Sequence, residues 1–137
     1  MGADDKLLQK CNEMNYKKIK DPVYETDIWC VWDCDKDELV EWVYKKFKLQ
    51  IEAITLRGRV LDLENDGVSA FIIYFHTAEW TLDFITLLNH ELMHLTSFIL
   101  SYCLIKLCDE TEECYAYFSS YLCKQILLTI FKRDIYD

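Results

Sequence analysis

Two histidines and a glutamate lie close together in residues 89–94, whose sequence is NHELMH. His90 and His94 are four residues apart, so in a helix their imidazoles project from one face and can bind a single Zn²⁺ ion. Glu91 follows the first histidine, where a carboxylate can reach a water on that metal and act as general base. This motif uses two of the three histidines in the chain. The chemistry it indicates is metal-assisted hydrolysis.

A catalytic zinc ion needs a third protein ligand, and the carboxylates of the acidic cluster at 109–113 are the candidates. The cluster opens a second predicted helix, where most of its members suit the positive end of the helix dipole. We expect Glu113 to be the ligand and leave Glu112 open as the alternative. Because a helix rises about 1.5 Å per residue, this assignment requires a break or bend after His94, near residues 96–101.

A tyrosine is the expected donor to the oxyanion that forms during hydrolysis. Tyr117 and Tyr121 follow Glu113 at four-residue intervals, so all three side chains share one helix face. Either phenol could donate to a developing negative charge. Aromatic core packing is the competing interpretation for both residues. We take Tyr117 as the candidate.

The first elements that must position these groups follow from the hydrophobic pattern. Residues 23–32 are rich in β-branched and aromatic side chains and predict a strand. Asp35 and Glu38 have the spacing of a capping box ahead of an apolar helical pattern that ends near Phe47. The segment LLQKCNEM at 7–14 predicts a short helix.

The second half of the chain predicts a hairpin followed by long helices. Apolar segments at 54–63 and 68–76 flank the turn sequence Asn-Asp-Gly, which predicts an antiparallel hairpin. Gly58 is interpreted as a bulge in its first strand. Thr77 is the predicted N-cap of one long helix, or two in line, ending near Leu107, and a second helix is predicted from 111 to 131.

The motif and its downstream glutamate resemble a known family. HELMH followed by Glu113 resembles the HExxH…E arrangement of the gluzincin, thermolysin-like zinc metallopeptidases. The string ECYAYFSSYL at 113–122 is similar to the E-A-[FY]-A-Y-x-x-x-Y-[LI] pattern of short zincin-like proteins of bacteriophages and prophages. The resemblance implies that His90, His94 and Glu113 bind zinc and that Glu91 activates water. Tyr117 occupies the place of an Asp in thermolysin-like enzymes, so the residue that orients the first histidine is unassigned.

These observations predict an α+β, minimal zincin-like domain over residues 1–137, with a polar N-terminal segment at 1–22. We expect a small, mostly antiparallel sheet of about three strands, an active-site helix that carries HExxH, and a C-terminal ligand helix. In most zincins the strand before the active-site helix is a sheet edge that binds an extended peptide. Residues 68–76 would be that strand here.

Composition limits the partners and the compartment. The chain carries 15 basic and 24 acidic residues, a net charge of −9, which disfavours binding to nucleic acid. Charged residues interrupt the apolar helices, so no membrane span is expected. Seven cysteines without a secretory signal indicate reduced thiols in the cytoplasm, which is the host cytoplasm if the protein is phage-encoded.

The predicted function is that of a zinc metallopeptidase acting on a peptide or protein substrate, with Glu91 as general base. Two alternatives stay open. One is a catalytically inactive zincin-like interaction module with a structural zinc ion, such as a phage-encoded factor that binds a host protein. The other is a metal-free helical scaffold or a component of a larger particle. A protein partner that completes the cleft fits the small size of the chain.

Overall fold

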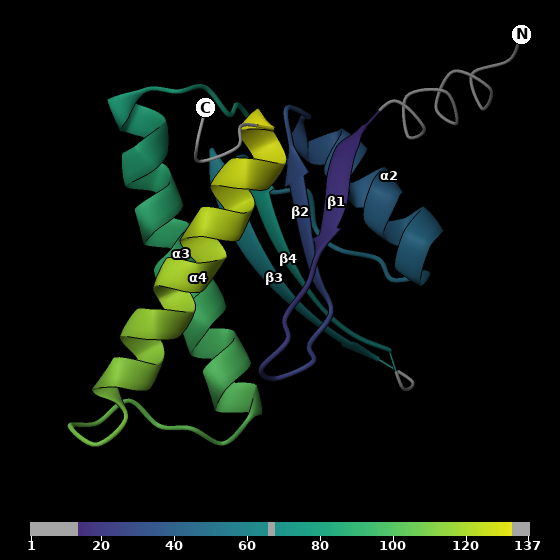
Figure 1. The fold of residues 1–137 in the computed structure, drawn as a ribbon. Coiled ribbons are helices and arrows are strands. Elements are labelled where there is room, and N and C mark those ends of the chain that lie inside the picture. Colours follow the sequence, from purple (N-terminus) through teal and green to yellow (C-terminus); the bar gives the residue numbers. More distant parts are fainter. Residues whose placement is uncertain (1–13, 66–67, 133–137) are drawn as a thin grey trace, which may run out of the picture.

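A mixed β-sheet forms the middle layer of the molecule in the computed structural model, which describes residues 14–65 and 68–132. Within these residues the sheet has four strands, with helix α2 on one face and helices α3 and α4 on the other (Figure 1). The predicted α+β class is therefore confirmed. In chain order the elements are β1 (Asn15–Ile19), β2 (Ile28–Trp32), α2 (Lys36–Phe47), β3 (Gly58–Asn65), β4 (Val68–Phe75), α3 (Leu82–Tyr102) and α4 (Glu112–Phe131).

The predicted hairpin is confirmed. β3 and β4 pair antiparallel in continuous register from Gly58 opposite Phe75 to Asn65 opposite Val68. The bulge predicted at Gly58 is wrong, because this glycine is a regular paired residue at the start of β3. Residues 66–67, at the centre of the predicted turn, lie outside the described residues, as does the helix predicted at 7–14 except for its last residue.

The N-terminal half of the sheet differs from the prediction. The strand predicted at 23–32 begins only at Ile28, because the residues before it form a turn around Asp21. The buried carboxylate of Asp21 accepts hydrogen bonds from the backbone N–H groups of Val23, Tyr24 and Thr26. β1 falls in the segment expected to be only polar. Four of its five residues are exposed, so it lacks the apolar alternation that would have indicated a strand.

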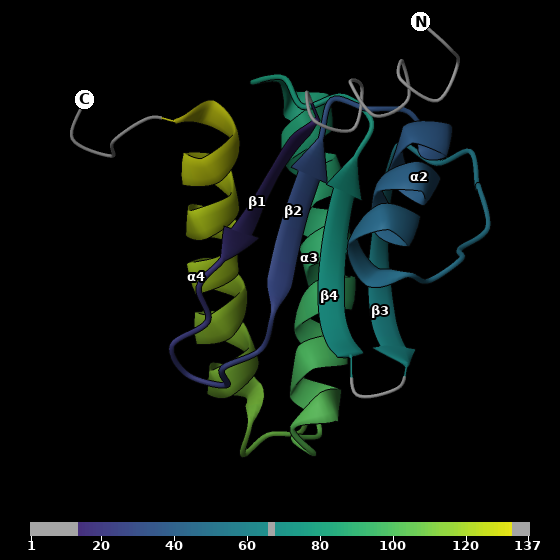
Figure 2. The ribbon, with the colours of Figure 1, turned by 90° about the vertical axis from the view of Figure 1, so that its right-hand side faces the viewer.

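The order of the strands places β4 inside the sheet. The order is β1-β2-β4-β3, and β4 is parallel to β2 on one side and antiparallel to β3 on the other (Figure 2). The prediction that 68–76 is an open edge for a peptide is therefore wrong over residues 71–75, which pair on both sides, whereas residues 68–70 pair with β3 alone. Two of the three pairings are antiparallel, and the parallel one follows from the crossover through α2.

Helix α2 begins as its sequence predicts. The Asp35 carboxylate accepts from the Glu38 backbone N–H at 2.8 Å, and the Glu38 carboxylate accepts from the Asp35 N–H at 3.2 Å, which completes the capping box. The helix buries Trp42 and its neighbours against one face of the sheet. On that face the Tyr74 hydroxyl donates to the Cys34 carbonyl at 2.6 Å, and burial raises the pKa of Tyr74.

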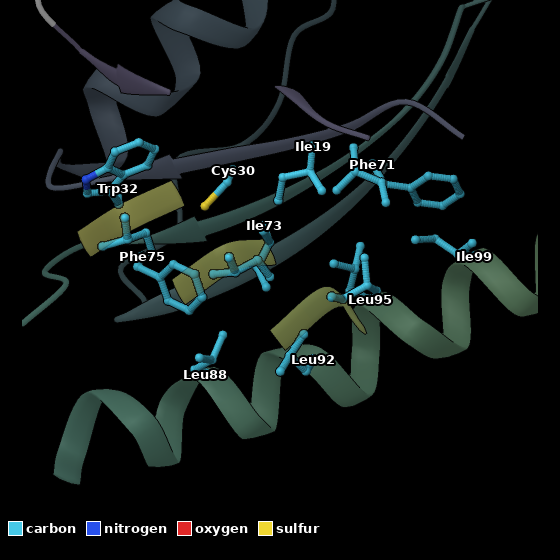
Figure 3. Packing of buried hydrophobic residues seen from close by; sticks show 14 of the residues in the cluster. Ile19, Cys30, Trp32, Phe71, Ile73, Phe75, Leu88, Leu92, Leu95 and Ile99 are labelled. Carbon is cyan, nitrogen blue, oxygen red and sulfur yellow. The ribbon is translucent and has the colours of Figure 1, made fainter. Parts of the chain in front are cut away.

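The opposite face of the sheet is covered by two helices. α3 contacts β3 and β4, whereas α4 contacts β1 and β2 (Figure 2). Figure 3 shows the side chains of α3 that point toward the apolar side chains of the sheet: Leu88, Leu92, Leu95 and Ile99. None of the helices in residues 14–65 and 68–132 combines the length and the hydropathy needed to cross a membrane.

Candidate metal centre

The HExxH motif lies in the middle of α3. This helix begins at Leu82, and the Thr81 hydroxyl caps it by accepting from the Phe84 N–H at 3.2 Å. The predicted N-cap, Thr77, is therefore four residues too early. α3 continues without a break to Tyr102, so the bend that was required near residues 96–101 does not occur.

The two histidines of the motif lie side by side on the surface of α3. Their Nε2 atoms are 3.3 Å apart, and both side chains are exposed. Two nitrogens bound to one tetrahedral zinc ion at about 2.0–2.1 Å are about 3.3–3.4 Å apart, so the pair matches one edge of that tetrahedron. The His94 ring also stacks on Phe98, with centroids 6.3 Å apart. At this distance the two rings share a hydrogen bond, and the same spacing is that of two nitrogen ligands of one zinc ion.

Glu91 lies beside the pair but is buried, with 6 % of its surface exposed. Burial raises the pKa of its carboxyl, and the neighbouring charges of His90 and His94 partly offset that rise. Its stem packs against Gly58 in β3, where an added Cβ would be 3.0 Å from Glu91 Cγ and 3.2 Å from Leu87 Cδ1. The glycine thus leaves room for the glutamate.

Gly58 is the residue that sequence reasoning assigned wrongly. A glycine inside a strand indicates either a bulge or the close approach of another group, and the contact with Glu91 shows that the second reason applies here. The pattern of β3 alone cannot distinguish these two reasons. The distinguishing fact is the position of α3, which the local sequence of β3 does not contain.

The predicted third ligand does not join the pair. Glu113 and the alternative Glu112 are exposed in the first turn of α4. Within residues 14–65 and 68–132 there is no group of three or more His, Cys, Asp or Glu side chains arranged to hold one metal ion. The structure thus brings together His90, Glu91 and His94 and leaves Glu113 apart from them.

Helix register and helix face both explain the position of Glu113. α3 extends eight residues beyond His94 (102 − 94), about 12 Å along its axis, whereas Glu113 is only the second residue of α4. In addition, Leu87 and Glu91 contact Gly58 in β3, so this side of α3 is turned toward β3. α4 lies over the other half of the sheet (Figure 2). Glu113 is therefore displaced from the histidine pair both along the axis of α3 and around it.

The candidate oxyanion donor also lies on α4. The Tyr117 side chain is 74 % exposed and is on the same helix face as Glu113, so the structure does not bring it to the histidines. Tyr121 has a structural role, because its hydroxyl donates to the Lys20 carbonyl at 2.8 Å and ties α4 to the segment between β1 and β2.

A hollow of about 200 Å³ lies between the end of the β3–β4 hairpin, the loop before α3 and the first turns of α3. Leu87 is the lining residue nearest in sequence to the motif, and His90, Glu91 and His94 are not part of the lining. The titratable side chains in its lining are both basic and acidic: Arg57, His76, Glu79 and Asp83. The β3–β4 hairpin brings Arg57 and His76 together, and the His76 N–H donates to the Arg57 carbonyl at 2.8 Å; Glu79 and Asp83 come from the loop before α3 and from its first turn, which the hairpin pattern does not place.

The resemblance to gluzincins rests on two strings of residues that the fold holds apart. HELMH lies in the middle of α3 and ECYAYFSSYL begins in the first turn of α4. The first string forms a compact pair of imidazoles with a carboxylate beside it. Comparison of the chain with models of protein families, with curated proteins and with solved structures finds no significant match.

Proposed function

We propose that this chain is a zincin-like, zinc-binding interaction module in which His90 and His94 hold the metal ion. The observation that carries the proposal is the 3.3 Å separation of their Nε2 atoms on an exposed helix face. Two imidazoles fill two of the four positions that zinc prefers, and the described residues supply no third ligand. Because both histidines are exposed, a zinc ion held by them would be accessible to another molecule.

Zinc titration with thermal unfolding of the full chain tests this proposal. Zinc that binds only the folded state raises the free energy of unfolding by about 2.7 kcal/mol at one hundred times its dissociation constant. We expect a clear rise in Tm with zinc for the wild type and none for His90→Ala or His94→Ala. His76→Ala is the matched control, because His76 is also exposed but lies outside the motif. An equal rise in all variants would contradict the proposal.

A second candidate function is zinc-dependent hydrolysis of a peptide or protein substrate, and the position of Glu91 favours it. The carboxyl of Glu91 is the one group of the motif that is buried next to the pair, and burial raises its pKa. The chemistry that zinc supplies at such sites is activation of water and polarisation of a carbonyl group. A third ligand from outside the described residues would have to complete the site.

Cleavage of a mixed peptide library in the presence of zinc tests the second candidate. Hydrolysis at this site requires that Glu91→Gln lose cleavage while its zinc-dependent rise in Tm persists. Glu79→Gln is the control, because it removes an exposed carboxylate from the hollow and keeps the motif intact. Cleavage that is the same in wild type and Glu91→Gln would refute the hydrolase.

A further inference from the structure

The exposed histidine pair presents a ligand set that is complementary to a copy of itself. The Nε2 atoms of each pair are 3.3 Å apart, which is the length of one edge of a zinc tetrahedron. A two-fold axis through the metal places a second, identical pair on the opposite edge. Four imidazole ligands would then fill the four-coordinate shell that structural zinc sites have.

The surroundings of the pair suit such a contact. Met93, one residue before His94, is 63 % exposed, and Phe98, which stacks on His94, is 38 % exposed. Met93, three residues after His90, and Phe98, four residues after His94, flank the pair on opposite sides, so a second copy that docks on the pair would cover part of each. α4 packs against α3, but both histidines are exposed and therefore lie outside that contact.

Charge favours a second histidine pair over acidic ligands. Each chain has a net charge of −9, so two copies repel one another in the absence of metal. Neutral imidazoles add no further negative charge, and the zinc ion places two positive charges at the contact. Repulsion between more distant side chains is screened beyond about 8 Å at physiological salt.

We propose that His90 and His94 from two copies of this chain bind one zinc ion between them, so that zinc assembles a symmetric dimer. The inference rests on the proposed function, because it specifies the partner that completes the same metal site. It also predicts that the zinc site is closed in the dimer, with four nitrogen ligands and no position left for a substrate.

Sedimentation analysis of the full chain, with zinc sulfate or with EDTA, tests the inference together with zinc analysis of the separated species. We expect a monomer in EDTA, a two-fold increase in mass with zinc, and one zinc ion per two chains. EDTA should reverse the change. His94→Ala should remain monomeric with zinc, whereas His76→Ala, which alters the only other histidine, should dimerise as the wild type does.

The outcomes separate this inference from the proposed function. One zinc ion per monomeric chain, lost in His94→Ala, would support the zinc site and overturn the dimer. A dimer that persists in EDTA or in His94→Ala would overturn zinc as the link between the copies. Absence of zinc binding by the wild type would overturn both proposals. Circular dichroism of His94→Ala verifies that this exposed substitution leaves the fold intact.

Discussion

The close approach between Gly58 and Glu91 makes Gly58→Ala the most informative single substitution. An added Cβ would lie 3.0 Å from Glu91 Cγ and 3.2 Å from Leu87 Cδ1, so at least one side chain has to move. At an open strand position alanine stabilises by about 0.5–1 kcal/mol relative to glycine. Overpacking of this kind costs about 1–3 kcal/mol. The second effect is larger, and we expect a net loss of about 1 kcal/mol in the free energy of unfolding.

Urea denaturation of four proteins measures this effect as a double-mutant cycle: wild type, Gly58→Ala, Glu91→Ala and the double variant. Glu91→Ala removes Cγ and with it the shortest contact, so the loss caused by alanine at position 58 should fall by at least half in that background. The reasoning is refuted if Gly58→Ala is as stable as the wild type, or if it loses the same free energy in both backgrounds.

Three further substitutions test other parts of the structure. Leu104 follows α3 with φ at 61°, a left-handed conformation that is unfavourable for leucine and favourable for glycine, and its side chain is 92 % exposed. Leu104→Gly should therefore raise the free energy of unfolding by about 1 kcal/mol in a urea titration. A decrease would contradict this reasoning. Tyr74→Phe removes the hydrogen bond to Cys34 and should lower the stability by about 1 kcal/mol in thermal melts, whereas unchanged stability would mean that the bond contributes nothing. Burial raises the pKa of Glu91, so the carboxyl stays protonated in the folded chain at pH values above its ordinary pKa of 4.5. The free energy of unfolding therefore falls as the pH rises from 4.5 toward the raised pKa. Glu91→Gln removes this dependence, so in metal-free buffer its stability relative to wild type should increase from pH 4 to pH 7, and a constant difference would show that burial does not perturb this carboxyl.

The elements that sequence predicts well here are those fixed by neighbouring residues. The capping box ahead of α2 and the hairpin of β3 and β4 depend on contacts within a few residues, and both are present. β1 was missed because an exposed, lysine-containing edge strand carries no apolar alternation. The sequence of β4 does indicate its interior position. Residues 70–75 form a continuous apolar run, which is typical of a strand covered on both faces, and all six are buried.

In the candidate site, too, the part that depends on neighbouring residues was predicted correctly and the part that depends on the packing of two helices was not. His90 and His94 meet because four residues make one helical turn, which the sequence specifies by itself. Bringing Glu113 to them depends on where α3 ends and on which side α4 lies, and neither follows from the spacing of 18 residues between His94 and Glu113. The helix ends at Tyr102 because the backbone N–H groups of Leu104 and Ile105 turn back to bond the carbonyls of Ser101 and Leu100.

The parallel pairing of β2 with β4 has a consequence for how the molecule acquires its structure. Ile28 and Phe71 are opposite one another although 43 residues (71 − 28) separate them in the chain. During synthesis β2 leaves the ribosome long before its central neighbour exists, while β3 and β4 can join as soon as residue 75 emerges. Since closing a long loop is slow relative to closing a hairpin, we expect the β3–β4 ribbon to form first and docking of β2 to limit the folding rate.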